Sequence, residues 1–228
     1  MPRSIPQGEC LCRCHLYHET TLSISRSFLT FRGNHVTILT VQDLATLSSI
    51  PTMPEISLQT IAQFYDQYLA NKQFCYEVAD KKKIIRIQFE SGALCHLLGI
   101  HHIVRGQEGK GWSGHMNILE KRITFDSLKA ANKGSFNEDI LRMICFPYVY
   151  QMLHNPRFIR ADANDIVKAE FILHDQYGKK YLQLKLRKQF PEHDHFYVPI
   201  TFKVLSKEVP KKNIQIKNFR QISLNEEY

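Results

Sequence analysis

The spacing of apolar residues predicts a helix followed by two strands. Between residues 57 and 71, apolar side chains recur every three or four residues, a pattern typical of one buried helix face. Ser57 is a suitable N-cap for this helix. The runs 74–79 and 83–89 are extended, the second alternating apolar and polar residues, and the polar residues 80–82 between them suit a hairpin turn.

A short apolar segment, FESGALCHLLGIHHI at residues 89–103, comes next. Leu94, Leu97 and Leu98 would share one face of a short helix. Gly99 is placed as the left-handed residue that ends this helix, because glycine adopts a positive φ without a steric penalty.

The remaining pattern changes from helices to strands. Helices are expected at about 115–122, 125–131 and 137–154, with Pro147 bending or interrupting the last of them. From Phe158 onward, β-branched and aromatic residues predominate and predict strands at 158–161, 166–176, 180–189 and 196–205. This order predicts an α+β fold in which helices pack on one face of a four-stranded antiparallel meander, so that the other face is free to carry a functional site.

Three segments are expected along the chain. Residues 1–55 form an N-terminal extension that is either poorly ordered or a small β-hairpin built from 23–31 and 35–41, because Pro51 and Pro54 separate it from the first long helix. Residues 56–205 form the main domain, and residues 206–228 form a basic C-terminal tail.

Charge suggests a polyanionic partner. The chain has a formal net charge of +8, yet the segment up to Glu55 holds only four of the 30 basic and four of the 22 acidic residues. The excess therefore lies in the rest of the chain, where a basic surface would attract nucleic acid, although a merely soluble basic protein would have the same composition. The sequence has neither the ~18 consecutive apolar residues of a membrane span nor a signal pattern. We therefore expect a cytoplasmic protein without a membrane partner.

The cysteines fall into two groups. Three of them, at 75, 95 and 145, sit singly in apolar patterns, as buried thiols do in a reducing compartment. The others belong to ECLCRCHLYH, where soft ligands are close together but do not have the spacing of common zinc modules. A structural metal is the minor alternative there; we expect no metal and no cofactor.

Strand 180–189 places two cations together. Leu182, Leu184 and Leu186 alternate with Gln183, Lys185 and Arg187, so Lys185 and Arg187 share the face opposite the leucines. On the next strand, Tyr197 and Thr201 join these cations if Phe196, Val198, Ile200 and Phe202 face the core. Such a face is either an ordinary solvated surface or a site for phosphodiester chemistry, where cations and hydroxyls stabilise charge on phosphate oxygens.

Histidines supply the proton-transfer groups that RNA cleavage needs, because the 2′-hydroxyl of RNA is itself the nucleophile and the imidazole pKa lies near neutrality. His96 lies at the margin of the apolar helix face, and His101 lies where the turn at Gly99 can direct it toward the sheet. The alternative for a lone histidine is a structural role at a helix end. We give His102 that role.

The segment QFESGALCHLLGIHHI resembles the signature of a nuclease family, the fourth group of phage-Barnase-EndoU-Colicin-RelE-like nucleases. The resemblance extends over roughly residues 56–205 and rests on Phe89, on the HLLG-x-H core at 96–101, and on the PITF sequence at 199–202. It implies a fold similar to barnase and RelE and metal-independent RNA cleavage, commonly by toxins of phage or mobile-element conflict systems.

The leading hypothesis is therefore a ribonuclease that cleaves by attack of the 2′-hydroxyl. Its partners would be RNA and, for a toxin, an antitoxin or immunity protein. The alternatives are a nucleic-acid-binding module without catalysis and a partner-binding protein of a phage or mobile element. The residues expected at the catalytic site, as general acid or base, as cations and as hydroxyl donors, are His96, His101, Lys185, Arg187, Tyr197 and Thr201.

Overall fold

A computed structural model describes residues 36–79, 83–190, 195–207 and 213–223. The cysteine and histidine cluster of the first 20 residues, the strand expected at 23–31, and the turns expected at 80–82 and 191–194 lie outside the described residues.

Helices form where the apolar spacing predicts them. Ser57 caps α2, its hydroxyl oxygen accepting a hydrogen bond from the Thr60 amide at 3.0 Å. Pro147 interrupts the expected long helix and becomes the residue before α8. None of the helices in the described part of the chain has the length and apolar character needed to cross a bilayer. The helical elements are α1 (Val41–Ala45), η1 (Met53–Glu55), α2 (Leu58–Tyr68), α3 (Leu94–Leu98), α4 (Ile100–Ile103), η2 (Gln107–Gly109), α5 (Gly111–Leu119), α6 (Phe125–Ala131), α7 (Lys133–Cys145) and α8 (Tyr148–His154).

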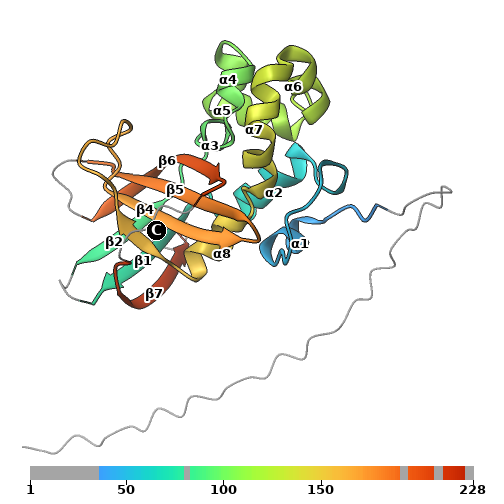
Figure 1. Ribbon diagram of the computed structural model, residues 1–228. Coiled ribbons are helices and arrows are strands. Elements are labelled where there is room, and N and C mark those ends of the chain that lie inside the picture. Colours follow the sequence, from blue (N-terminus) through green and yellow to red (C-terminus); the bar gives the residue numbers. More distant parts are fainter. Residues whose placement is uncertain (1–35, 80–82, 191–194, 208–212, 224–228) are drawn as a thin grey trace, which may run out of the picture. The chain divides into compact units, whose positions relative to one another are not determined.

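The sheet corrects the predicted fold class. Among the described residues it has seven strands in the order β3-β4-β5-β6-β2-β1-β7, and it curls into a half-barrel (Figure 1). The predicted meander is present as β3 to β6, but β6 continues into a parallel pair with β2. The strands are β1 (Lys72–Val78), β2 (Ile84–Gln88), β3 (Phe158–Arg160), β4 (Phe171–Tyr177), β5 (Lys180–Lys188), β6 (Phe196–Leu205) and β7 (Ile216–Ser223).

The four-stranded antiparallel prediction was wrong because strand pairing between distant segments leaves no local signal. The hairpin β1–β2 was identified from its pattern, yet nothing in its sequence specifies that β2 pairs with β6. The seventh strand, β7, comes from the segment expected to be a basic tail and pairs with β1 over its whole length. Its sequence, IKNFRQIS, alternates too weakly to stand out as a strand.

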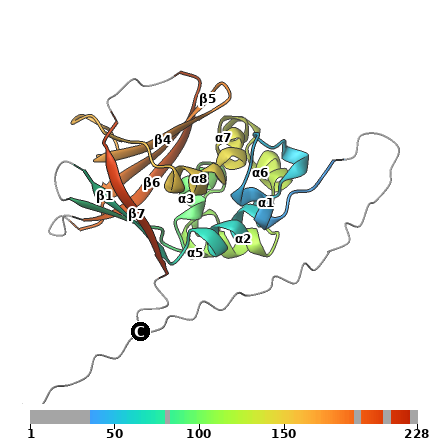
Figure 2. The ribbon, with the colours of Figure 1, turned by 90° about the horizontal axis from the view of Figure 1, so that it is seen from below.

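The core lies inside the curve of the sheet. There, α8 packs against β1: the Tyr76 hydroxyl donates to the Leu153 carbonyl at 2.7 Å, and the rings of Phe74 and His154 meet edge to face. Figure 2 shows the helices gathered on one side of the sheet. The leucines of β5 point into this core, as the alternation predicts. We call the face that carries these leucines the inner face and the opposite one the outer face.

A bulge in β6 changes which residues reach the outer face. Lys185 is opposite Thr201, but the next residue of β5, Leu186, is opposite Pro199, so Ile200 is the extra residue. Proline cannot donate a ladder hydrogen bond and is tolerated at such irregular positions. Beyond the bulge the alternation is reversed, so Tyr197 points into the core and is only 1% exposed.

Residues 36–55 pack on the helices. Leu44 of α1 is fully buried, the Leu39 amide donates to the Glu55 carbonyl at 2.8 Å, and Gln151 of α8 donates to the Leu47 carbonyl at 2.9 Å. The strand expected at 35–41 does not form in its described part, where α1 begins at Val41.

Candidate functional site

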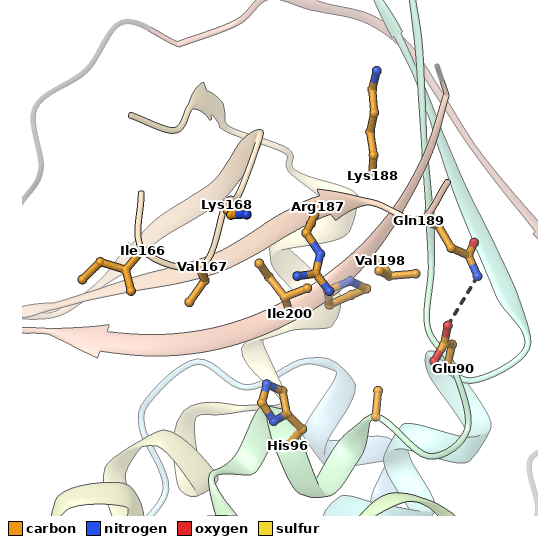
Figure 3. A pocket seen from close by; sticks show the side chains of 12 residues that line it. Glu90, His96, Ile166, Val167, Lys168, Arg187, Lys188, Gln189, Val198 and Ile200 are labelled. Atoms are coloured by element: carbon orange, nitrogen blue, oxygen red, sulfur yellow. Dashed lines mark hydrogen bonds between the residues drawn. The ribbon is translucent and has the colours of Figure 1, made fainter. Parts of the chain in front are cut away.

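A cavity of about 1000 Å³ opens on the outer face, between α3 and the loop 161–170. Its floor is formed by Arg187 of β5 with Val198 and Ile200 of β6. Figure 3 shows the Arg187 guanidinium over Ile200 on the side that faces His96, whereas Lys188 points away. The remaining lining residues come from the loop, from the segment before α3, from the end of β5 and from β6: Glu90, Ala93, Ile166, Val167, Lys168, Gln189 and Pro199.

His96 presents its imidazole to this cavity. The ring stands below Arg187 (Figure 3). Partial burial lowers the pKa of His96, the backbone of Ile200 opposes this shift, and the charges of Arg142, His102 and Arg187 lower the pKa further. The imidazole is therefore neutral near pH 7 and able to accept a proton.

The C-terminal end of α3 is held by Arg142 of α7. Its Nε donates to the Leu97 carbonyl at 2.5 Å and its Nη2 to the His96 carbonyl at 2.8 Å, which gives the carbonyls at the end of the helix a charged donor. Gly99 has the predicted left-handed conformation, with φ of 80°. The Asp139 carboxylate lies against this glycine and accepts from Arg142 at 3.4 Å. The backbone that carries His96 is thereby fixed.

His101 and His102 lie behind His96 and do not line the cavity. The His101 ring stacks on His96 with centroids 4.4 Å apart, and His102 follows at 3.9 Å from His101. Burial lowers the pKa of His101 to about 4, with the charges of His102 and His96 adding to the shift. His102 meets Asp139 at 3.2 Å, a structural contact at a helix end. The arrangement makes His101 a neutral support for His96.

Lys185 organises the loop that forms one wall of the cavity. Its ammonium pairs with Asp165, and both side chains are mostly buried, at 15% and 10% exposed. The other Asp165 oxygen accepts from the Ala169 amide at 3.1 Å. These contacts fix the loop so that Lys168, which has a φ of 54°, lines the cavity. Lys168 thus occupies the place that the sequence suggested for Lys185.

The two hydroxyl residues are separated by the bulge. Thr201 is 8% exposed and its hydroxyl accepts from Arg142 at 3.5 Å, next to the cavity but not in its lining. Tyr197 lies on the inner face, where its hydroxyl donates to Glu170 at 3.2 Å and its ring meets the edge of Phe171. The expectation that Tyr197 stands beside Arg187 fails because the bulge reverses the alternation.

Of the six residues expected at the site, the structure therefore places His96 and Arg187 together in the cavity. Sequence reasoning missed Glu90, Lys168 and Arg142. Glu90 directly follows Phe89 of the motif and could have been noted, since a carboxylate is a proton-transfer group. Lys168 and Arg142 come from a loop and a helix whose positions no local pattern specifies.

The cavity is equipped to bind a phosphodiester. Arg187 and Lys168 provide positive charge, Glu90 accepts a hydrogen bond from Gln189 at 3.4 Å, and His96 provides a neutral base. Among the residues that the structure describes, no group of three or more His, Cys, Asp or Glu side chains is arranged to hold a metal ion.

Comparison with known proteins identifies the family. Residues 57–223 match the family model described as phage-Barnase-EndoU-ColicinE5/D-RelE like nuclease 4. No curated protein and no solved structure matches the chain. The matched region includes the whole seven-stranded sheet and every residue of the cavity, and it supports a nuclease-like function. The chain belongs to the phage-Barnase-EndoU-ColicinE5/D-RelE like nuclease 4 family.

Proposed function

We propose that this protein is an endoribonuclease that cleaves RNA by attack of the 2′-hydroxyl without a metal ion. The observation that carries the proposal is the position of His96 and Arg187, which face one cavity from two elements that are distant in the sequence. The neutral His96 favours its role as the general base, because a protonated imidazole cannot accept the 2′-hydroxyl proton.

The reaction uses the groups of the cavity as follows. His96 takes the proton of the 2′-hydroxyl, whose oxygen forms a bond to phosphorus while the bond from phosphorus to the 5′-oxygen breaks. Water supplies the proton to the leaving 5′-oxygen. Arg187 and Lys168 stabilise the charge that develops on the non-bridging oxygens. The products are a 2′,3′-cyclic phosphate and a 5′-hydroxyl, and His101 positions the imidazole of His96.

Cleavage of total RNA and tRNA in EDTA tests this proposal. The His96→Ala and Arg187→Ala variants should each lose at least about 100-fold in rate, the usual size of general-base and electrostatic effects. Arg122→Ala, at a side chain that is 63% exposed, serves as the matched control and should cleave like the unaltered protein. Mass spectrometry should find the cyclic phosphate, and oligonucleotides with 2′-deoxyribose should stay intact.

The proposal would be refuted by wild-type rates in both cavity variants or by equal cleavage of DNA. Binding of RNA without cleavage would instead identify a nucleic-acid-binding module. Because the family is named for phage-associated nucleases, we further propose that the activity serves as a toxin in conflict between genetic elements. Induced expression in a bacterium should then arrest growth, and the His96→Ala variant should not.

A further inference from the structure

A row of basic residues leads away from the cavity across the outer face. Arg187 is paired with Val198, and Phe196, two residues before Val198 on β6, has the same orientation. The register continues from Phe196 to Arg86 of β2, then to Cys75 of β1, and finally to Arg220 of β7. Residues paired in register point to the same side of a sheet, so Arg187, Arg86 and Arg220 share the outer face.

Arg86 is held in place in the middle of this row. Its guanidinium carbon lies 5.3 Å from the centre of the Phe196 ring, a cation–π contact that orients the flat group over β6. Its Nε is buried and has no hydrogen-bond partner among the described residues. A buried, charged donor without a partner is costly, and this cost is relieved when an anion binds beside it. Arg220, farther along the row, is exposed.

The row ends at a second hollow of about 620 Å³. Its lining includes outer-face residues of β1, β2 and β7, among them Cys75, Ile84 and Arg220. Glu77 is the acidic residue that lines this hollow, and its carboxylate already contacts Asn218 at 2.7 Å and Lys217 at 3.8 Å. The net charge of the lining residues is therefore positive, which suits a phosphate group.

We propose that a single strand of RNA runs along this row, with its phosphates on Arg86 and Arg220 and its cleaved bond at His96. The inference rests on the proposed ribonuclease function. From β5 to β7 the row crosses four strand spacings, which is about 19 Å at ~4.8 Å each. At a stacked rise of about 3.4 Å per nucleotide, this distance corresponds to roughly six nucleotides. RNA shorter than this reaches the cavity without reaching Arg220.

Fluorescence anisotropy with uncleavable 2′-O-methyl oligonucleotides of 4 and 12 nucleotides tests the inference. Arg220→Ala should weaken binding of the 12-mer about 5- to 10-fold and reduce the slope of log K against log salt by about 0.7, the value for one phosphate contact on a single strand. It should leave binding of the 4-mer unchanged. The Arg122→Ala variant controls for loss of one positive charge, and Arg86→Lys, which keeps the charge, should have a smaller effect than Arg86→Ala.

The outcomes separate this inference from the proposed function. If Arg220→Ala binds the 12-mer with unaltered affinity and salt slope, or if a 12-base-pair duplex competes as well as the single strand, the RNA path is wrong whether or not the protein cleaves. If the length and Arg220 effects are found with 2′-O-methyl RNA but ordinary RNA stays intact, the path is supported and the proposed ribonuclease function fails.

Discussion

Replacing Gly99 with alanine tests how the HLLGIHH segment positions His96. Gly99 has a φ of 80°, a conformation that alanine adopts only at a cost of about 1–2 kcal/mol. An added Cβ would also lie 2.6 Å from the Asp139 carboxylate, where ordinary contact begins at 3.4 Å. The carboxylate therefore has to move away from the turn by close to an ångström.

Moving Asp139 weakens two charged contacts. The carboxylate accepts from Arg142 at 3.4 Å and meets His102 at 3.2 Å, and the Arg142 side chain is only 11% exposed. Loss of a hydrogen bond to a charged group costs about 1.5–3 kcal/mol. Together with the backbone strain, we expect Gly99→Ala to lower the free energy of unfolding by about 3 kcal/mol, and the melting temperature by roughly 6–12 °C for a domain of this size.

Gly178→Ala provides a matched control for the assay. Gly178 also has a positive φ, 56°, but an added Cβ would meet nothing within 4 Å. Its replacement should therefore cost only the backbone strain of about 1–2 kcal/mol. Thermal unfolding followed by circular dichroism measures both variants. Equal losses of stability would refute the reasoning, because they would show that the contact between Gly99 and Asp139 contributes nothing.

Two further predictions concern the supports of the site. Lys185→Met should lower the free energy of unfolding in urea by about 3 kcal/mol, because it leaves the mostly buried Asp165 unpaired. The double variant Lys185→Met with Asp165→Leu should recover part of this loss. If the losses of the two single variants simply add in the double variant, the ion pair does not contribute to stability. Acidification from pH 6.5 toward pH 4 should lower the free energy of unfolding by about 1–2 kcal/mol because of His101. In the unfolded chain this histidine takes up a proton over that range, whereas in the folded protein its pKa is about 4. His101→Asn should flatten this pH dependence, and an unaltered curve would contradict the assignment.

The local elements could be predicted from the sequence, and their assembly could not. Apolar spacing located α2 and α3, the hairpin of β1 and β2, and the meander from β3 to β6, because these depend on residues close together in the chain. The pairing of β2 with β6 joins residues more than 100 positions apart, and it depends on which edges remain available after the helices pack. The four-stranded prediction failed at that pairing.

The residues of the site could likewise be predicted only where a local pattern places them. Arg187 was found because simple alternation along β5 puts it opposite the leucines. His96 was a candidate from its place at the margin of an apolar helix face and from the resemblance of the HLLG-x-H core to the nuclease family. Lys185 has the same orientation as Arg187, but its partner Asp165 lies in a loop whose conformation the pattern does not reveal. Tyr197 was misplaced by one inserted residue, since a bulge shifts every position beyond it.

The pairing of β2 with β6 also has a consequence for biosynthesis. His96 is made early, whereas Arg187 and the strand that supports it follow about 90 residues later, at a ribosomal rate of about 5–20 residues per second. Until β6 has left the ribosome, β2 has no neighbour on that side and the cavity has no floor. Under the proposed ribonuclease function, a nascent chain therefore could not cleave the RNA that surrounds it until β6 has joined β2.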